Sequence, residues 1–242
     1  MRKTLLIGLL ALIVGAGAHA LAPQRVELHE RLVVSPTAQD KAVALTLDAC
    51  GGAFDADLIA TLVARRIPAT IFVTKTWLDR NPVGTAALLA HPELFELEDH
   101  GTQHVPAVIG RDARVYGLRG EPDVQHLQTE VSGAARAIAA LTGRAPTYYR
   151  GATAIYDRQS MQVIESMGYR LAGFSISADA GATLPQAAVE ARLRAVRPGD
   201  IILAHMNKPA GTTAEALALV LPELQSRHYH FVKLEDVALQ AQ

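Results

Sequence analysis

Apolar runs with the two-residue period of β-strands alternate with amphipathic helical segments about seven times between residues 41 and 234. Strict alternation of this kind favours parallel strands joined by crossover helices, because a parallel pair needs a long connection that packs back onto the sheet. Seven units suit a closed or nearly closed barrel, and a doubly wound open sheet is the alternative. We therefore predict an α/β fold with one barrel domain over residues 41–242.

The separate elements follow from local patterns. Lys41–Asp48 alternates apolar and β-forming residues, which predicts the first strand, and residues 54–66 carry apolar side chains at helical spacing. The glycine- and proline-rich residues 101–123 predict a long loop, and long loops in compact domains are often functional. The other strands are predicted to begin near residues 69, 95, 147, 169, 200 and 228. Further helices are predicted at residues 76–89, broken around Asn81-Pro82, and at residues 124–141, 157–167, 185–196 and 213–227.

Residues 1–20 have the pattern of a secretory signal peptide. Arg2 and Lys3 precede the apolar run Thr4–Val14, and Ala18-His19-Ala20 is a small-x-small cleavage pattern. The apolar run is short for a membrane span, so an uncleaved anchor is the less favoured alternative. We expect cleavage near Ala20, an exported protein that is periplasmic or secreted, no stable membrane insertion after cleavage, and a polar N-terminal lead over residues 21–40.

Charge and cysteine content exclude several classes of protein. The formal net charge is −1 without a long run of either sign, so the sequence carries no electrostatic footprint for nucleic acid. Cys50 is the single cysteine, so no internal disulfide can form. Half of the 242 residues are hydrophobic, which is enough for one sizeable core. The fold must therefore be held together by that core alone.

Chemically capable side chains follow several of the predicted strands. Ligands of parallel α/β folds bind outside the carboxyl ends of the strands, so residues at those ends share one rim. Each residue alone has an ordinary structural explanation, such as a cap, an ion pair or a buried core histidine. Their common position makes a catalytic site the better interpretation. These residues are Asp48, His100 with His104, Arg150, Asp179 and His205.

These residue types together suit metal-assisted hydrolysis of an ester or an amide. Two histidines and a carboxylate leave coordination positions of a metal open, which is typical of catalytic sites. A second carboxylate can act as the base and a further histidine as the acid for the leaving group. An arginine can hold a carboxylate through two parallel hydrogen bonds. We expect a divalent metal, zinc first, with cobalt, nickel or iron as alternatives.

The same residues resemble the ordered motifs of the polysaccharide deacetylases, the chitooligosaccharide deacetylase homology domain of carbohydrate esterase family four. The motifs are Thr46-Leu47-Asp48, His100-Gly101-Thr102-Gln103-His104, Arg150 after a strand, Asp179, and Leu203-Ala204-His205. The resemblance covers about residues 40 to 236. It implies a distorted (β/α)7-type barrel and metal-dependent removal of acetyl groups from an acetylated carbohydrate of the cell envelope.

The resemblance also implies a role for each matching residue. Asp48 falls at the catalytic base, His100 and His104 at the two metal histidines, and Arg150 at the arginine that orients the base. Asp179 falls at the acid that tunes the acid histidine, and His205 at that general acid.

The chain departs from the family pattern in its first motif. The family usually has two adjacent aspartates there, the second of which binds the metal, whereas this chain has Ala49 followed by Cys50. Three explanations are open. In the first, Asp48 itself binds the metal together with His100 and His104, and Asp179 or water takes over as the base. In the second, Cys50 supplies a thiolate, since soft ligands suit zinc. In the third, the metal has been lost and the protein no longer hydrolyses anything. Two smaller departures are Gly101, where Ser or Thr is usual, and Gly151-Ala152-Thr153 after the arginine.

These departures leave two alternative functions beside the deacetylase. One is a non-catalytic relative that binds a glycan or a protein and keeps the barrel, for which Ala49 is the main support. The other is a metal-dependent amidase that acts on peptides or small amides. The deacetylase remains the first hypothesis, with an acetylated glycan as its substrate.

Overall fold

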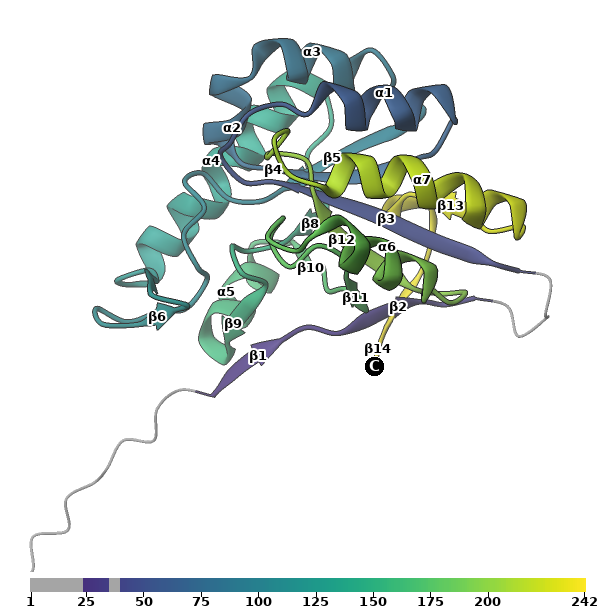
Figure 1. Cartoon of the computed structure of the whole chain (residues 1–242). Coiled ribbons are helices and arrows are strands. Elements are labelled where there is room, and N and C mark those ends of the chain that lie inside the picture. Colours follow the sequence, from purple (N-terminus) through teal and green to yellow (C-terminus); the bar gives the residue numbers. More distant parts are fainter. Residues whose placement is uncertain (1–23, 35–39) are drawn as a thin grey trace, which may run out of the picture.

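The computed structural model describes residues 24–34 and 40–242, and its centre is a curled sheet of parallel strands (Figure 1). The strand order is β10-β8-β5-β4-β3-β12-β11, with β13 paired to β3 beside this path. The predicted signal peptide lies outside the described residues. The strands are β3 (Ala42–Ala49), β4 (Ala69–Val73), β5 (Phe95–Asp99), β8 (Tyr148–Tyr149), β10 (Arg170–Leu171), β11 (Ile176–Ser177), β12 (Ile201–His205) and β13 (His230–Val232).

Helices surround the outer face of this sheet, so it forms a half barrel of the predicted (β/α)7 type, and the predicted fold class is confirmed (Figure 1). None of the helices in the described ranges has the length and apolar character needed to cross a membrane. The helices are α1 (Ala56–Ala64), α2 (Lys75–Arg80), α3 (Pro82–Leu89), α4 (Val124–Thr142), α5 (Arg158–Ser166), α6 (Gln186–Arg194) and α7 (Thr213–Ser226), with a short 3-10 helix η1 (Leu234–Asp236).

The central strand β3 is buried on both faces, and its two faces have different neighbours. Val43, Leu45 and Leu47 belong to the large outer apolar cluster that the helices cover. Ala44 belongs to a second cluster inside the half barrel. Because side chains alternate along a strand, this register directs Asp48 into the interior at the carboxyl end of β3.

The strand predicted over residues 169–176 is in fact two short strands on opposite edges of the sheet. β10 pairs with β8, and β11 pairs with β12. Between them, the N-terminal lead crosses the opening: the amide of Phe174 donates to the carbonyl of Leu28, and the amide of Glu30 donates to the carbonyl of Phe174. The prediction of one strand was wrong because the lead takes the hydrogen bonds that a continuous strand would have made with its neighbours.

The lead therefore closes the seam of the half barrel. A Cβ on Gly173 would lie 2.6 Å from the carbonyl oxygen of Leu28, so the close approach of the two backbones requires glycine there. Arg31 continues the seal with an ion pair to Asp200. The lead and its partners form four further strands: β1 (Arg25–Glu27) pairs antiparallel with β9 (Ile155–Asp157), and β2 (Glu30–Leu32) pairs antiparallel with β14 (Leu239–Ala241).

A buried pair of glutamates in β5 makes the stability of the fold depend on pH. Glu96 and Glu98 lie on the inner face and are almost fully buried. Burial raises the pKa of Glu96, and burial together with the charge of Glu96 raises the pKa of Glu98 to about 9. In the unfolded chain both side chains lose their protons near pH 4.5, so between pH 4.5 and 9 the folded chain binds more protons. The free energy of unfolding is therefore expected to decrease as the pH rises. The decrease is up to about 1.4 kcal/mol per pH unit for each proton that the folded chain binds in excess of the unfolded chain.

The substitution Glu96→Gln is expected to flatten this pH dependence, because it removes one titrating group and the charge that acts on Glu98. Denaturant unfolding measured from pH 5 to pH 9 checks it. Glu165→Gln, on the exposed side of α5, is the matched control and should keep the wild-type slope. If the free energy of unfolding changed equally with pH in the wild type and in Glu96→Gln, the buried glutamate pair would not be the source of the pH dependence.

Candidate active site

The structure brings all six predicted site residues to the carboxyl end of the sheet. Asp48 in β3 lies directly opposite His205 in the neighbouring strand β12. His100 follows the last residue of β5, and Arg150 follows β8. The two remaining residues, His104 and Asp179, reach the same end from the loops after β5 and β11. The common rim that the sequence predicted is therefore present.

Asp48 and Arg150 form a buried ion pair inside the half barrel. Nη1 of Arg150 lies 2.9 Å from Oδ1 of Asp48 and also donates to Oγ1 of Thr46. Nη2 and Nε donate to the carbonyls of Gly173 and Ala172, and the guanidinium stacks 4.2 Å from the centroid of the Phe72 ring. These contacts hold the guanidinium of Arg150 in one position. Arg150 in turn holds Oδ1 of Asp48, whereas Oδ2 makes no hydrogen bond with Arg150.

The environment keeps Asp48 ionised. Burial alone would raise the pKa of this carboxyl, but the charges of His100, Arg150 and His205 outweigh burial and hold the pKa below its usual value. A carboxylate that is ionised at neutral pH and held at the edge of a cavity can accept a proton.

His205 and Asp179 form a second polar pair. Nδ1 of His205 lies 2.8 Å from Oδ1 of Asp179, and Oδ2 of Asp179 accepts hydrogen bonds from the backbone amide of His205 and from Oγ1 of Thr213. Burial would lower the pKa of His205, but the hydrogen bond and the charge of Asp179 contribute to raising it well above the ordinary value. A histidine held in this way can keep a proton at Nε2 and deliver it to a leaving group.

His100 is oriented by the chain so that one ring nitrogen is available as a ligand. Its Nδ1 lies 2.6 Å from the carbonyl oxygen of Arg150. A carbonyl only accepts, so Nδ1 carries the hydrogen, and Nε2 faces Cys50 at 3.5 Å and Asp48 at 3.7 Å. Burial alone would lower the pKa of His100, but the charges of Asp48 and Cys50 raise it to about 9. The surroundings of His100 therefore stabilise a positive charge. A bound metal ion can provide that charge in place of the proton on the imidazole.

His104 is held next to His100 by a loop that packs on α4. The two imidazole centroids lie 4.8 Å apart. His104 adopts a left-handed backbone conformation with φ of 66°. The buried carboxylate of Glu130 accepts hydrogen bonds from the amides of Gln103 and Val105 on either side of it. These bonds compensate for a strained conformation at a non-glycine residue.

The packing of Glu130 against this loop also explains why residue 101 is a glycine. Its φ is +86°, and a Cβ at this position would lie 2.5 Å from Oε1 of Glu130. Glycine is therefore required at position 101 for two reasons, the positive φ of the backbone and the close approach of the Glu130 carboxylate. Sequence reasoning missed Glu130, although an acidic residue among the apolar positions of the predicted helix 124–141 was a usable signal.

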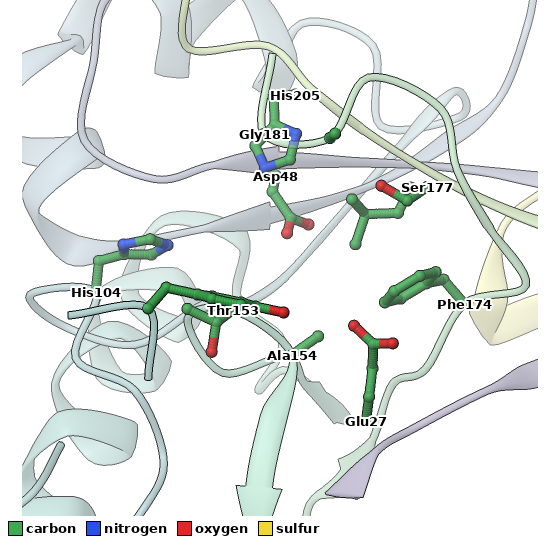
Figure 2. A pocket seen from close by; sticks show the side chains of 12 residues that line it. Glu27, Asp48, His104, Thr153, Ala154, Phe174, Ser177, Gly181 and His205 are labelled. Carbon is green, nitrogen blue, oxygen red and sulfur yellow. The ribbon is translucent and has the colours of Figure 1, made fainter. Parts of the chain in front are cut away.

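A cavity of about 400 Å³ lies beside these residues. Asp48, His104 and His205 line one wall, and Figure 2 shows the carboxylates of Asp48 and Glu27 directed into it from opposite walls. Phe174 adds an apolar surface to the same cavity. Tyr116, at the tip of the hairpin β6–β7 (Arg114–Val115 and Leu118–Arg119), lines it from the long loop over residues 101–123.

Glu27 is a second wall residue that sequence reasoning missed. It belongs to β1 in the lead, where neither period nor motif marks it as part of a site. Its place on the wall follows from the pairing of β1 with β9, which brings the lead beside the carboxyl ends of the strands. A contact between segments so distant in sequence leaves no local signal.

The ligand atoms of Cys50, His100 and His104 all lie within 4.8 Å of one another, and in the described part of the chain this is the group suited to a metal ion. One thiolate and two imidazoles are a donor set that binds zinc. The residues present therefore fit a metal. Asp48 is not a member of this group, and its predicted role as a metal ligand remains a prediction.

A sequence profile of the polysaccharide deacetylase family matches residues 35–172 of the chain. No curated protein matches the sequence. The family profile thus covers more than half of the chain, including the motifs at Asp48, His100, His104 and Arg150.

Solved structures share the fold at low sequence identity. A CE4 family pseudoenzyme from Bacillus anthracis has a TM-score of 0.65 and 16% identity, over 82% of this chain and 65% of that chain. A family 4 carbohydrate esterase from Bacillus anthracis has a TM-score of 0.59 and 23% identity, over 82% of each chain. A family 4 carbohydrate esterase from Bacillus subtilis has a TM-score of 0.63 and 18% identity, over 82% of this chain and 80% of that chain. The present chain thus spans just under two thirds of the first of these proteins.

Proposed function

Because the chain belongs to the polysaccharide deacetylase family, we propose that it is a metal-dependent hydrolase that removes acetyl groups from an acetylated carbohydrate of the cell envelope. The observation that carries the proposal is the arrangement of two polar pairs, Asp48 with Arg150 and His205 with Asp179, beside one cavity and next to the histidine pair. These pairs separate a base from an acid, as hydrolysis of an amide or ester requires.

In this proposal each residue has one task. Water attacks the acetyl carbon while Asp48 accepts its proton, and Arg150 keeps the carboxylate in place. His205 gives a proton to the departing nitrogen or oxygen of the sugar as the bond to the acetyl carbon breaks, and Asp179 orients that imidazole. His100 and His104 would hold a divalent metal, which when bound would supply Lewis-acid polarisation of the acetyl group. The products are acetate and the free amine or alcohol of the sugar.

The donor set supports zinc as the metal, with cobalt, nickel or iron as alternatives. The signal pattern of residues 1–20 supports export to the periplasm or the medium, with cleavage after Ala20. The mass of the protein recovered from those fractions tests the cleavage, and recovery of only the uncleaved chain would contradict it.

The substitution His100→Ala is expected to abolish stoichiometric metal binding and to lower acetate release to background, because it removes a buried ligand whose position the chain fixes. Elemental analysis of the purified protein, followed by acetate release from N-acetylated and O-acetylated oligosaccharides, checks both. His126→Ala is the matched control, since this exposed histidine of α4 pairs with Asp123 at the helix start and lies outside the group suited to a metal ion.

A second candidate function is a non-catalytic protein that binds glycans or proteins, and the observation that favours it is Ala49 in place of a metal carboxylate. The same experiment separates the two. Wild-type protein that takes up no metal from zinc solution and releases no acetate, yet binds an oligosaccharide, would favour the binding protein and contradict the hydrolase.

A further inference from the structure

The side chain of Cys50 points to the inner side of the half barrel, as that of Asp48 does, whereas the side chain of Ala49 points to the outer side. Side chains alternate along a strand, so in β3 Thr46 and Asp48 share the inner face while Leu47 and Ala49 face the helices. Cys50 follows the last residue of β3, and its Sγ lies 3.5 Å from Nε2 of His100 on the inner side. Ala49 is fully buried in the outer apolar cluster together with Leu47. The residue that follows Asp48 on the inner face is therefore the cysteine.

The distances around Cys50 agree with a shared metal ion. Its Sγ lies 3.5 Å from Nε2 of His100, and both lie within 4.8 Å of the nearest ring nitrogen of His104. In a tetrahedral zinc site with Zn–S of about 2.3 Å and Zn–N of about 2.05 Å, a sulfur and a nitrogen ligand are about 3.6 Å apart. The sulfur and the first imidazole are thus already at the separation of two ligands of one ion.

The surrounding chain orients all three groups. The carbonyl of Arg150 fixes the ring of His100 with Nε2 toward the sulfur, and Oγ1 of Thr74 donates to the carbonyl of Cys50. The loop that carries His104 is braced by Glu130. Hydrogen bonds of this kind, behind the ligands, are what orients ligands in metal sites.

One oxygen of Asp48 is held by Arg150, and Asp48 does not belong to the group of converging ligand atoms. Its Oδ1 accepts from Arg150, whose other donors are held by two backbone carbonyls. Oδ2 lies 3.7 Å from Nε2 of His100, and Asp48 lies outside the group of converging ligand atoms. Asp48 remains available to accept a proton if another group completes the metal site.

We propose that Cys50 is the third protein ligand of the metal, so that this site is a Cys-His-His centre in which the thiolate takes the place of a carboxylate. The inference rests on the proposed metal-dependent function. A thiolate carries the same single negative charge as a carboxylate, and three protein ligands leave a coordination position open. Because sulfur is a soft donor, the centre selects zinc or cobalt over magnesium, calcium or manganese.

X-ray absorption at the zinc edge tests the proposal directly on the wild-type protein loaded with one zinc per chain. We expect one sulfur neighbour at about 2.3 Å and nitrogen or oxygen neighbours at about 2.0–2.1 Å. In Cys50→Ser the sulfur neighbour should disappear, and zinc affinity should fall by at least the roughly 10–100-fold that loss of a hydrogen-bond partner behind a ligand typically costs. In the matched variant Asp48→Asn the sulfur neighbour and the zinc should both remain.

The outcomes separate this inference from the proposed function. Zinc bound by the wild type without a sulfur neighbour would overturn the role of Cys50, and loss of zinc in Asp48→Asn would then identify the aspartate as the ligand within the same hydrolase. A wild type that binds no zinc would overturn both proposals. The wild-type spectrum decides the matter even if Cys50→Ser fails to fold.

Discussion

The substitution Asp48→Asn is expected to lower acetate release by about 10³-fold while the protein stays folded and keeps its metal. Asparagine has the size of aspartate and can still accept from Arg150, but it cannot take a proton from water. General bases typically contribute about 10²–10⁴-fold to a rate. The measurement is acetate release per bound metal under saturating substrate, which separates loss of the base from loss of the ion.

Asp200→Asn is the control for this experiment. Asp200 is also a buried aspartate paired with an arginine, Arg31, but it lies at the seam of the half barrel and not beside the cavity. Its substitution should leave turnover per folded molecule within a few-fold of wild type. Asp48→Asn with more than a tenth of wild-type turnover would remove Asp48 from the role of base.

The substitution Arg150→Met is expected to lower the free energy of unfolding by about 3–5 kcal/mol, the usual cost of removing one partner of a buried ion pair. Arg150 is fully buried. Its loss would leave the charge of Asp48 without its partner and the carbonyls of Ala172 and Gly173 without these donors. Urea unfolding of the metal-free protein measures the effect apart from metal binding.

Arg194→Met is the matched control, because Arg194 makes ion pairs with Glu190 and Glu223 at the surface. Exposed ion pairs contribute little to stability, so the free energy of unfolding of this variant should stay close to that of the wild type. The double variant Asp48→Asn, Arg150→Met should be more stable than the sum of the single effects predicts. A loss below about 1 kcal/mol in Arg150→Met would show that the buried pair does not stabilise the fold.

The fold class could be predicted because its signals are local. Alternation of two-residue and helical periods identified the strands β3, β4, β5 and β12 and the helices between them. The rule that parallel α/β sheets bind ligands at the carboxyl ends of their strands then grouped Asp48, His205 and Arg150 correctly. The contact between Asp48 and Arg150 depends on the curl of the sheet, because β5 and β4 lie between β8 and β3 in the strand order.

What could not be predicted depends on contacts between distant segments. The division of residues 169–176 into two strands follows from the hydrogen bonds of Phe174 with the lead, which no local pattern announces. The same holds for Glu27 on the cavity wall. Cys50 lies just past the end of β3, so strand alternation could not predict where its side chain points, and the contact of its Sγ with His100 is known only from the structure.

The sealed seam of the half barrel has a consequence for how this chain reaches its folded state. Segment 28–32 is synthesised early, yet Arg31 pairs with Asp200, 169 positions later, and β2 pairs with β14 near the other end of the chain. Contacts so distant in sequence form slowly, because a long loop must close before they stabilise anything. β1 and β2 are made before the strands of the main sheet, yet they dock only after β9, β12 and β14 have been made.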